Sequence, residues 1–499
     1  MRRLSVFPAH FDLDSVESIC SDDHLCPTDQ VYSLLAQLTE KSLAVAEPDP
    51  EQPRLRLLES MREFGRKQLE EAGEFVSAHD RHLAYFANWI EIVETRMEES
   101  SNPLLSRQAR EEHHNIRAAL DWALDPRANF KDGVRLVTAI SLYWMEQSLF
   151  KEGAERARPF LERSAGDPGL AYHHARLMYR MGAFAFYRLD FEEAYELSRA
   201  SVELNRQIGA RRSLSSALYY LGMAACELKR LDESRAAFGE SLELSRAEND
   251  HTQTCLTLLG LADVTRLQNR MDEAEALIHE SLALARKIHD TWGANKAIQE
   301  LATHYYKQGL LGLARETYER NRVEMLELGD VMGAAQTLNA LAYIANEQND
   351  FRASGEYARK ARGIFKEIYD FGQTGFSHRM TAYAELHAGD PQKAREHCLE
   401  SLRWNHAAHP TAGMMACLAC LAEIELAQGN PTEAARLRRL VERALAEHNL
   451  TLLPPDVNAL ARVNSALAVH ADLPFEETTL EAALNELLSE TDPPPADMP

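Results

Sequence analysis

The sequence predicts a mainly α-helical solenoid, a superhelix built from helical hairpins of about 40 residues and preceded by a small α/β unit. Three observations lead to this fold class. A small residue recurs at a fixed interval along most of the chain, apolar residues within each interval are spaced three and four apart, and short turn segments divide each interval.

The recurring small residue defines the repeat. These marker residues, each forty positions after the last, are Ala154, Ala194, Ser234, Ala274, Ala314, Ser354, Ala394 and Ala434. Another small residue, such as Gly182 or Gly222, lies twelve positions before most markers. Two helix axes can approach closely only where the side chains are small, so these positions are expected to mark the crossing of two helices. Each repeat is therefore predicted as helix A, a tight turn, helix B and a longer connection such as residues 246–252.

The first seventy residues have a different pattern. Asp12 is expected to cap a helix that runs through Ile19, and Thr28 a second helix that runs through Glu40. Two short strands, SLAVAE and RLRLLE, flank the turn PDPEQP, and a third helix ends at Gly73. Helices followed by a two-stranded wing indicate a winged-helix-like unit.

The charge balance narrows the possible functions. The chain has 499 residues, with 54 basic and 77 acidic side chains and a formal charge of −23, which argues against nucleic acid or an anionic membrane as the main partner. Seven cysteines spread over this length do not form a disulfide framework, and neither a signal peptide nor a membrane-spanning run is recognisable. We therefore expect a cytoplasmic protein.

No enzyme signature with useful specificity is present. The sequence contains no GxxxxGK[ST], HExxH, GxSxG or GxGxxG motif, so we expect neither catalysis nor a cofactor. Cys417-x-x-Cys420 lies in an apolar helix and is better explained as small core residues than as a metal or redox pair. Histidines of the sixth and seventh intervals could approach one another, but acidic ligands at matching spacing are missing.

The repeat resembles the tetratricopeptide repeat (TPR), through Leu218, Leu221-Gly222, Ser234, Phe238 and Ser241. The usual TPR has about 34 residues, so the extra ones must lengthen the helices or the connection. In TPR arrays the positions 18, 15, 11 and 8 before the marker usually face a concave groove. Carried onto this chain, these groove positions include Arg176, Tyr179, Phe186, Tyr219, Met223, Asp263, Arg266, Lys296, Gln299, Tyr306, Gln336, Asn339, Tyr343, Asn346, Arg379 and Tyr383.

Such a lining suits an extended peptide, a protein segment or a polar small effector. Amide side chains can bind a ligand backbone, and tyrosine offers rigid contact area at low entropic cost. The alternative for each residue is that it packs between adjacent repeats.

A second resemblance covers nearly the whole chain. The segments RRLSVFPAHFDLDSVESIC, LLAQLTEKSLAVAE, RLRLLESMREFGRKQLEEAGE and EEHHNIRAALDWALD follow one another as in the STAND-class signal-transduction ATPases of LuxR- and SARP-type transcriptional regulators. The resemblance implies a winged helix and a TPR sensor. The P-loop ATPase domain and the DNA-binding domain of that family have no counterpart here, so the chain is expected to be half of a split or truncated regulator, or a stand-alone descendant.

These patterns together predict five segments: a winged-helix-like remnant (1–73), a helical linker (74–133), a TPR superhelix of about eight hairpins with an atypical first one (134–448), C-terminal capping helices (449–490) and a disordered tail (491–499). The expected function is non-enzymatic binding of a peptide, protein partner or small effector in signal transduction or transcriptional regulation. A separate ATPase subunit is a further candidate partner. The alternative is a DNA-associated regulator that acts through the winged helix and its basic cluster Arg54, Arg56, Arg62 and Arg66.

Overall fold

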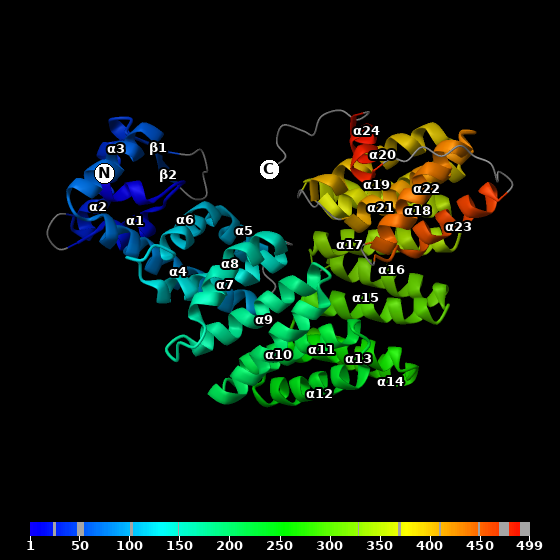
Figure 1. Cartoon of the computed structure of the whole chain (residues 1–499), viewed down its shortest axis with the longest axis horizontal. Helices are drawn as coiled ribbons and strands as arrows, with labels where there is room; N and C mark the ends of the chain where they lie inside the picture. The colour runs from blue at the N-terminus through cyan, green and yellow to red at the C-terminus, as the bar shows by residue number, and fades with distance from the viewer. Residues whose placement is uncertain are drawn as a thin grey trace. The chain divides into compact units, whose positions relative to one another are not determined.

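The computed structural model describes residues 1–22, 26–46, 54–99, 103–147, 149–327, 329–367, 371–408, 411–447, 450–468 and 479–489 (Figure 1). The chain divides into two compact units, Met1–Gly293 and Ala294–Pro499. Helical hairpins make up most of both units, so the predicted mainly α-helical repeat fold is confirmed.

The first unit begins with the small α/β region. A 3-10 helix, η1 (Arg2–Val6), precedes α1 (Leu13–Cys20), α2 (Thr28–Glu40), β1 (Ala44–Ala46), β2 (Leu55–Leu57) and α3 (Glu59–Glu71). Asp12 caps α1 as predicted, because its carboxylate accepts a bond of 2.8 Å from the Ser15 amide. Thr28, in contrast, was wrongly predicted as a cap: it is the first residue of α2, and the preceding Pro27 provides no side-chain bond.

The two strands form an antiparallel ribbon. Ala44 lies opposite Leu57, and Leu55 also exchanges backbone bonds with Phe11. Most of the turn expected between the strands lies outside the described residues. Gly73 follows α3 with a φ of +70°, which is the left-handed conformation expected of the residue that ends a helix.

Three helices connect this region to the repeats. They are α4 (Phe75–Glu99), α5 (Pro103–Glu111) and α6 (His113–Ala123). The first hairpin, α7 (Phe130–Glu146) and α8 (Phe150–Ser164), contains the marker Ala154, and α4 packs along α7.

Seven regular hairpins follow. The first unit contains α9 (Ala171–Tyr187) with α10 (Phe191–Ile208), α11 (Arg211–Glu227) with α12 (Leu231–Ala247), and α13 (His251–Leu267) with α14 (Met271–Lys287). The later ones are α15 (Thr291–Lys307) with α16 (Leu311–Glu327), α17 (Val331–Glu347) with α18 (Phe351–Glu367), α19 (Phe371–His387) with α20 (Pro391–Ala408), and α21 (Thr411–Ala427) with α22 (Pro431–Glu447). The A helices begin at intervals of forty residues from Ala171 to Thr411, as the marker spacing predicts.

The longer connection predicted after helix B is wrong. Residues 248–250 join α12 to α13, and the A-to-B turn at 228–230 has the same length. The additional residues instead lengthen the helices, since each helix from α11 to α19 has 17 residues. A left-handed residue recurs about every twenty positions, as at Lys229, Asn249 and Asn269, in the described connections after α9 to α17, α19 and α21.

The markers lie where the helices of a hairpin cross. All eight are buried. The Ser234 hydroxyl donates a bond of 2.6 Å to the Gly222 carbonyl, and Ser354 donates one of 2.8 Å to Ala342, twelve residues back in both cases. A Cβ atom at Gly222 would lie 2.9 Å from the Phe238 ring. The small residues therefore permit this close approach.

A second set of bonds repeats seven positions after the markers. Ser201 donates to the carbonyl of Ala175, twenty-six residues earlier, at 2.7 Å, and Ser401 does the same to Gly375 at 2.7 Å. The Asn321 amide donates to Asn295 at the same separation. Equivalent residues thus make equivalent contacts in hairpins of both units.

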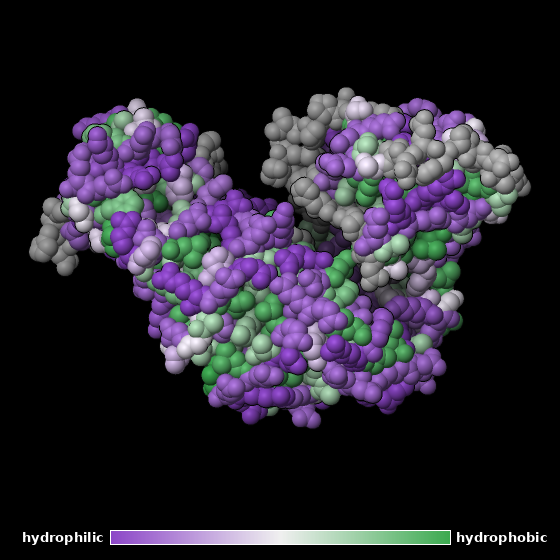
Figure 2. Space-filling view, viewed as in Figure 1, coloured by the Kyte–Doolittle hydropathy of each residue, from purple (hydrophilic) through white to green (hydrophobic). Residues whose placement is uncertain are grey.

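The second unit ends with two further helices, α23 (Pro454–Leu467) and α24 (Leu480–Ser489). α23 packs mainly on α21 and also contacts α22 and α17. The expected disordered tail, 491–499, lies outside the described residues. Hydrophilic side chains cover most of the surface visible in Figure 2, and none of the described helices is long and apolar enough to cross a bilayer.

Candidate ligand-binding surface

In the first unit, the predicted groove residue Arg176 is bound to a helix outside the repeats. Its guanidinium lies 2.8 Å from the carboxylate of Glu94 on α4. Arg180, one turn further along α9, lies 3.2 Å from the same oxygen. All three side chains are largely buried, so Glu94 joins α4 to the A helix of the second hairpin.

Aromatic groove positions of this unit contact one another. The ring of Tyr179 stacks on that of Tyr220 with centroids 6.0 Å apart, and Tyr219 meets the edge of Phe238 at 5.8 Å. Tyr179 and Tyr219 are buried, whereas Tyr220 is partly exposed. The spacing rule missed Tyr220 because it lies one position beyond those that the rule selects.

The remaining predicted groove residues of the first unit make two kinds of contact, apolar packing and an ion pair. Phe186 meets the rings of Tyr187 and Phe191, and Met223 packs against the cluster around Val264. Arg266 is buried and forms an ion pair with Asp263 on the same helix.

In the second unit, amides link adjacent A helices. The Asn295 side chain donates to Gln336 at 3.3 Å, and Asn339 donates to Gln373 at 2.9 Å. Lys296 and Gln299 are partly exposed on α15. Burial lowers the pKa of Lys296, and nearby Glu300 opposes that effect.

Tyr306 and Tyr343 form an aromatic pair on α15 and α17. Their ring centroids are 5.4 Å apart, and the Tyr306 hydroxyl donates a bond of 3.0 Å to Glu347. Both rings are partly exposed, and burial raises the pKa of Tyr343. The pair therefore offers apolar area beside a carboxylate.

Asn346 lies one turn beyond Tyr343. It is only 6% exposed, and among the described residues its Nδ2 atom has no hydrogen-bond partner. A buried amide without a partner costs free energy, so this group is a candidate donor to a ligand.

Arg379 and Tyr383, the last predicted groove residues, bind a segment of the chain itself. The carboxylate of Asp456 on α23 lies 2.9 Å from Arg379 Nε and accepts a bond of 3.0 Å from the Tyr383 hydroxyl. Asp456 and Tyr383 have no exposed surface, and Arg379 is 4% exposed. Burial raises the pKa of Asp456, while Arg379 acts in the opposite direction.

Two further contacts show how α23 lies on the A helices. Arg462 pairs with Glu423 on α21 at 2.9 Å, and Asn458 donates to Glu347 on α17 at 3.1 Å. The A helices that bind polar side chains of α23 are thus α17, α19 and α21, and we call this surface the α17–α19–α21 face. Ala459, Leu460 and Val463 bury the apolar side of α23 against it.

The cysteine pair is packed in the core, and two of the histidines contact each other. Cys417 and Cys420 are fully buried on α21, and Ser401 lies 3.1 Å from the Cys417 sulfur. His378 and His397 do approach each other, with Nδ1 atoms 3.3 Å apart. The described residues contain no group of three or more His, Cys, Asp or Glu side chains arranged for a metal ion.

The basic cluster near the wing is largely paired with acidic residues. Arg54 forms ion pairs with Glu111 and Glu112, at 3.1 and 2.9 Å. Arg62 and Arg66 pair with Glu59 and Glu70 on the same helix. These carboxylates would oppose the approach of a phosphate backbone.

Comparison with known proteins supports this reading of the hairpins. A tetratricopeptide repeat family model matches residues 213–287. This stretch comprises the two hairpins α11–α12 and α13–α14, and the other regular hairpins share their forty-residue spacing. The chain also resembles the crystal structure of a "Signal Transduction ATPase with Numerous Domains (STAND) protein with a tetratricopeptide repeat sensor", PH0952 from Pyrococcus horikoshii. That similarity has a TM-score of 0.52 at 15% identity and covers 98% of this chain and 64% of the other, so it bears on the fold alone.

Curated relatives match a shorter stretch. Proteins named HTH-type transcriptional regulator Rv0890c, from Mycobacterium tuberculosis, and Mb0914c, from Mycobacterium bovis, are each 30% identical over 164 residues. The match covers 32% of this chain and 18% of each relative, so the chain spans only a small part of their length. The TPR repeats fit an interaction or sensor module.

Proposed function

We propose that this protein is a non-enzymatic TPR module that binds a peptide or protein segment on the α17–α19–α21 face. The observation that carries the proposal is the seating of α23, because Arg379 and Tyr383 hold a helix through one buried carboxylate. An amphipathic helix laid on an apolar surface is a common mode of peptide recognition. A protein partner would use the same chemistry, with Tyr306, Tyr343 and Asn346 extending the surface onto α15 and α17.

We infer that the module acts in a regulatory pathway, as the sensor part of a LuxR- or SARP-type STAND regulator. Similarity to regulators that carry the HTH name and to a STAND sensor fold supports this context. A separate ATPase subunit would then be one partner, and a small effector on the same face is a second form of input.

A peptide added in trans tests the binding surface. The probe is a fluorescein-labelled peptide with the sequence of residues 454–467, and the protein is the full chain carrying Asp456→Ala. This substitution weakens the docking of α23, so the peptide should bind the variant at least about tenfold more tightly than the parent chain, in which α23 occupies the face.

Two controls accompany this measurement. A peptide carrying its own Asp456→Ala change should lose binding, because Arg379 and Tyr383 then receive no carboxylate. Adding Tyr306→Ala and Tyr343→Ala to the protein should weaken capture without changing helicity, because the Asn458 position of the peptide lies beside Glu347 and its tyrosine partner. Equal binding of both peptides by all the proteins would reject the proposed surface.

A further inference from the structure

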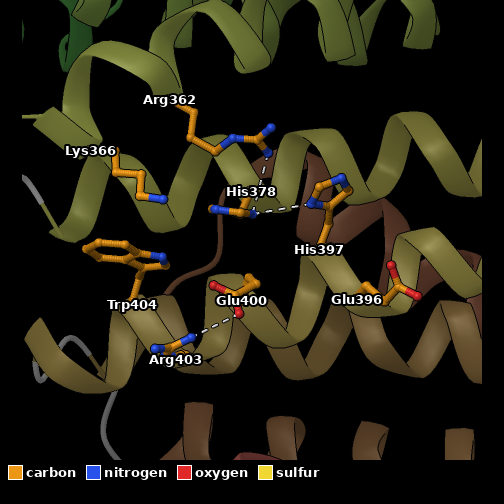
Figure 3. Close-up of a pocket in the computed structure, with 8 residues that line it drawn as sticks. All are labelled: Arg362, Lys366, His378, Glu396, His397, Glu400, Arg403 and Trp404. Carbon is orange, nitrogen blue, oxygen red and sulfur yellow. Dashed lines mark hydrogen bonds and ion pairs between the residues drawn. The ribbon is translucent and has the colours of Figure 1, made fainter. Parts of the chain in front are cut away.

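A pocket on α18, α19 and α20 is separate from the residues that hold α23. Its volume is about 420 Å³, within the size range of small-molecule sites. Arg362 and Lys366 project from α18, His378 comes from α19, and α20 contributes His397 and Trp404 (Figure 3). The predicted groove positions contribute none of the residues that line it.

Cationic side chains converge on this pocket. Arg362 is half-buried, and its Nη1 atom lies 3.5 Å from Nδ1 of His378. Among the residues that the structure describes, no carboxylate forms an ion pair with Arg362 or with Lys366. Burial, together with the neighbouring Arg359, lowers the pKa of Arg362, and the nearby Glu400 opposes this effect only in part.

The two histidines are neutral donors and acceptors rather than additional charges. Burial lowers the pKa of His378 to about 3, with further contributions from Arg362 and His397. Burial and Arg362 also lower the pKa of His397. His378 Nδ1 accepts from Arg362, so the 3.3 Å contact between the rings requires His397 Nδ1 to donate.

Acidic residues of the pocket compensate only part of this charge. Glu400 is paired with Arg403 at 3.1 Å, and Glu396 is exposed at the rim. Arg362 and Lys366 therefore remain as two positive charges facing the solvent-accessible space of a chain whose net charge is strongly negative. Trp404, largely buried, provides an aromatic edge on the same side as Lys366 (Figure 3).

We propose that this pocket binds a small organic phosphate monoester, with the phosphate between Arg362 and Lys366 and the organic part against Trp404. A phosphate monoester carries nearly two negative charges at neutral pH, which matches two cations that form no ion pair among the described residues. Arginine binds phosphate oxygens through two donors and lysine adds a point charge. The site is independent of the surface proposed for peptide binding.

Isothermal titration of the full chain with phenyl phosphate tests the site, with inorganic phosphate and phenol as matched probes at constant ionic strength. We expect saturable binding of phenyl phosphate, binding of inorganic phosphate at least about tenfold weaker, and no binding of phenol. Equal affinity for both phosphates would overturn the role of Trp404 and assign the pocket to free phosphate.

Charge-removing variants locate the binding. Arg362→Gln and Lys366→Gln should each weaken phenyl phosphate about tenfold or more. Lys360→Gln removes the same charge from an exposed position of α18 outside the pocket, and it should leave the affinity within about twofold. Circular dichroism melting confirms that each variant is folded. Binding unchanged in Arg362→Gln, or equal losses in all three variants, would overturn the proposal.

Discussion

Glu94 in the first unit and Asp456 in the second are both buried carboxylates that come from helices outside the repeats and bind arginines on A helices. Their helices differ in how they are held. α4 has 25 residues and packs along α6 and α7, whereas α23 has 14 and packs mainly on α21. Glu94 meets two arginines, and Asp456 meets one arginine and a tyrosine hydroxyl.

This difference shows that two buried ion pairs of the same kind can contribute unequally to holding their helices in place. Removing a carboxylate from water is costly, and the cost is recovered only while its partners stay in place. α4 has extensive apolar packing to hold it in position without Glu94. α23 has a smaller apolar side, so its position depends more strongly on Asp456. We therefore expect a competing peptide to displace α23 from the α17–α19–α21 face more readily than it could displace α4.

The largest effect is expected from Asp456→Ala. The change leaves Arg379 and the Tyr383 hydroxyl buried without their carboxylate, and it should lower the free energy of unfolding by about 3–5 kcal/mol. Glu94→Ala should cost less, about 2–3 kcal/mol, because Arg176 is 13% exposed and can bind water. Urea denaturation measures both, and hydrogen exchange should show α23 opening before α4. A larger loss from Glu94→Ala would reverse the comparison.

An intermediate effect is expected inside a hairpin, where no added helix takes part. Gly222→Leu places a side chain against Phe238 and should cost about 1–3 kcal/mol by overpacking. Gly239→Ala is the matched control on the next helix: no atom lies within 4 Å of its added Cβ, so it should stabilise the chain by about 0.5–1 kcal/mol. Thermal melting distinguishes the two, and an unchanged melting curve for Gly222→Leu would contradict the assigned helix crossing.

The smallest effect concerns a buried histidine of the first unit. His82 packs between Phe7 and Phe86, and burial lowers its pKa to about 3. The unfolded chain therefore binds a proton that the folded chain excludes between pH 6.5 and pH 3, and stability falls as the pH falls through this range. His82→Phe should remove about 1–2 kcal/mol of the loss between pH 7 and pH 5, measured by urea denaturation at both pH values. The same slope in both proteins would show that other groups cause it.

The repeat was predictable because its cause is local. Helices that cross need small residues at the crossing, so Gly222 and Ser234 mark the fold directly in the sequence. The equal helix lengths had a partial signal in the sequence. Asn249-Asp250 combines a left-handed residue with an N-cap, and Leu189-Asp190 and Gly329-Asp330 are similar pairs. Counting those pairs would have corrected the expected long connection.

The covering of Arg379 and Tyr383 could not be predicted in the same way. Their groove assignment follows from position within the repeat, but their partner Asp456 lies outside the period, seventy-three residues beyond Tyr383. Contacts of this kind depend on how a separate helix docks, which no spacing rule encodes. Tyr220 and the pocket residues Arg362, Lys366 and Trp404 were missed for a related reason, because the rule selects only four positions of each A helix.

The even spacing of the turns also bears on how such a chain can grow or shrink. Removing residues 211–250 would place His251 where Arg211 now begins, in phase with the preceding hairpin. Loss or gain of a few residues within a helix would instead rotate everything after it by about 100° per residue and bury the wrong side. Whole-hairpin duplication and deletion are therefore the length changes that this architecture accommodates most readily.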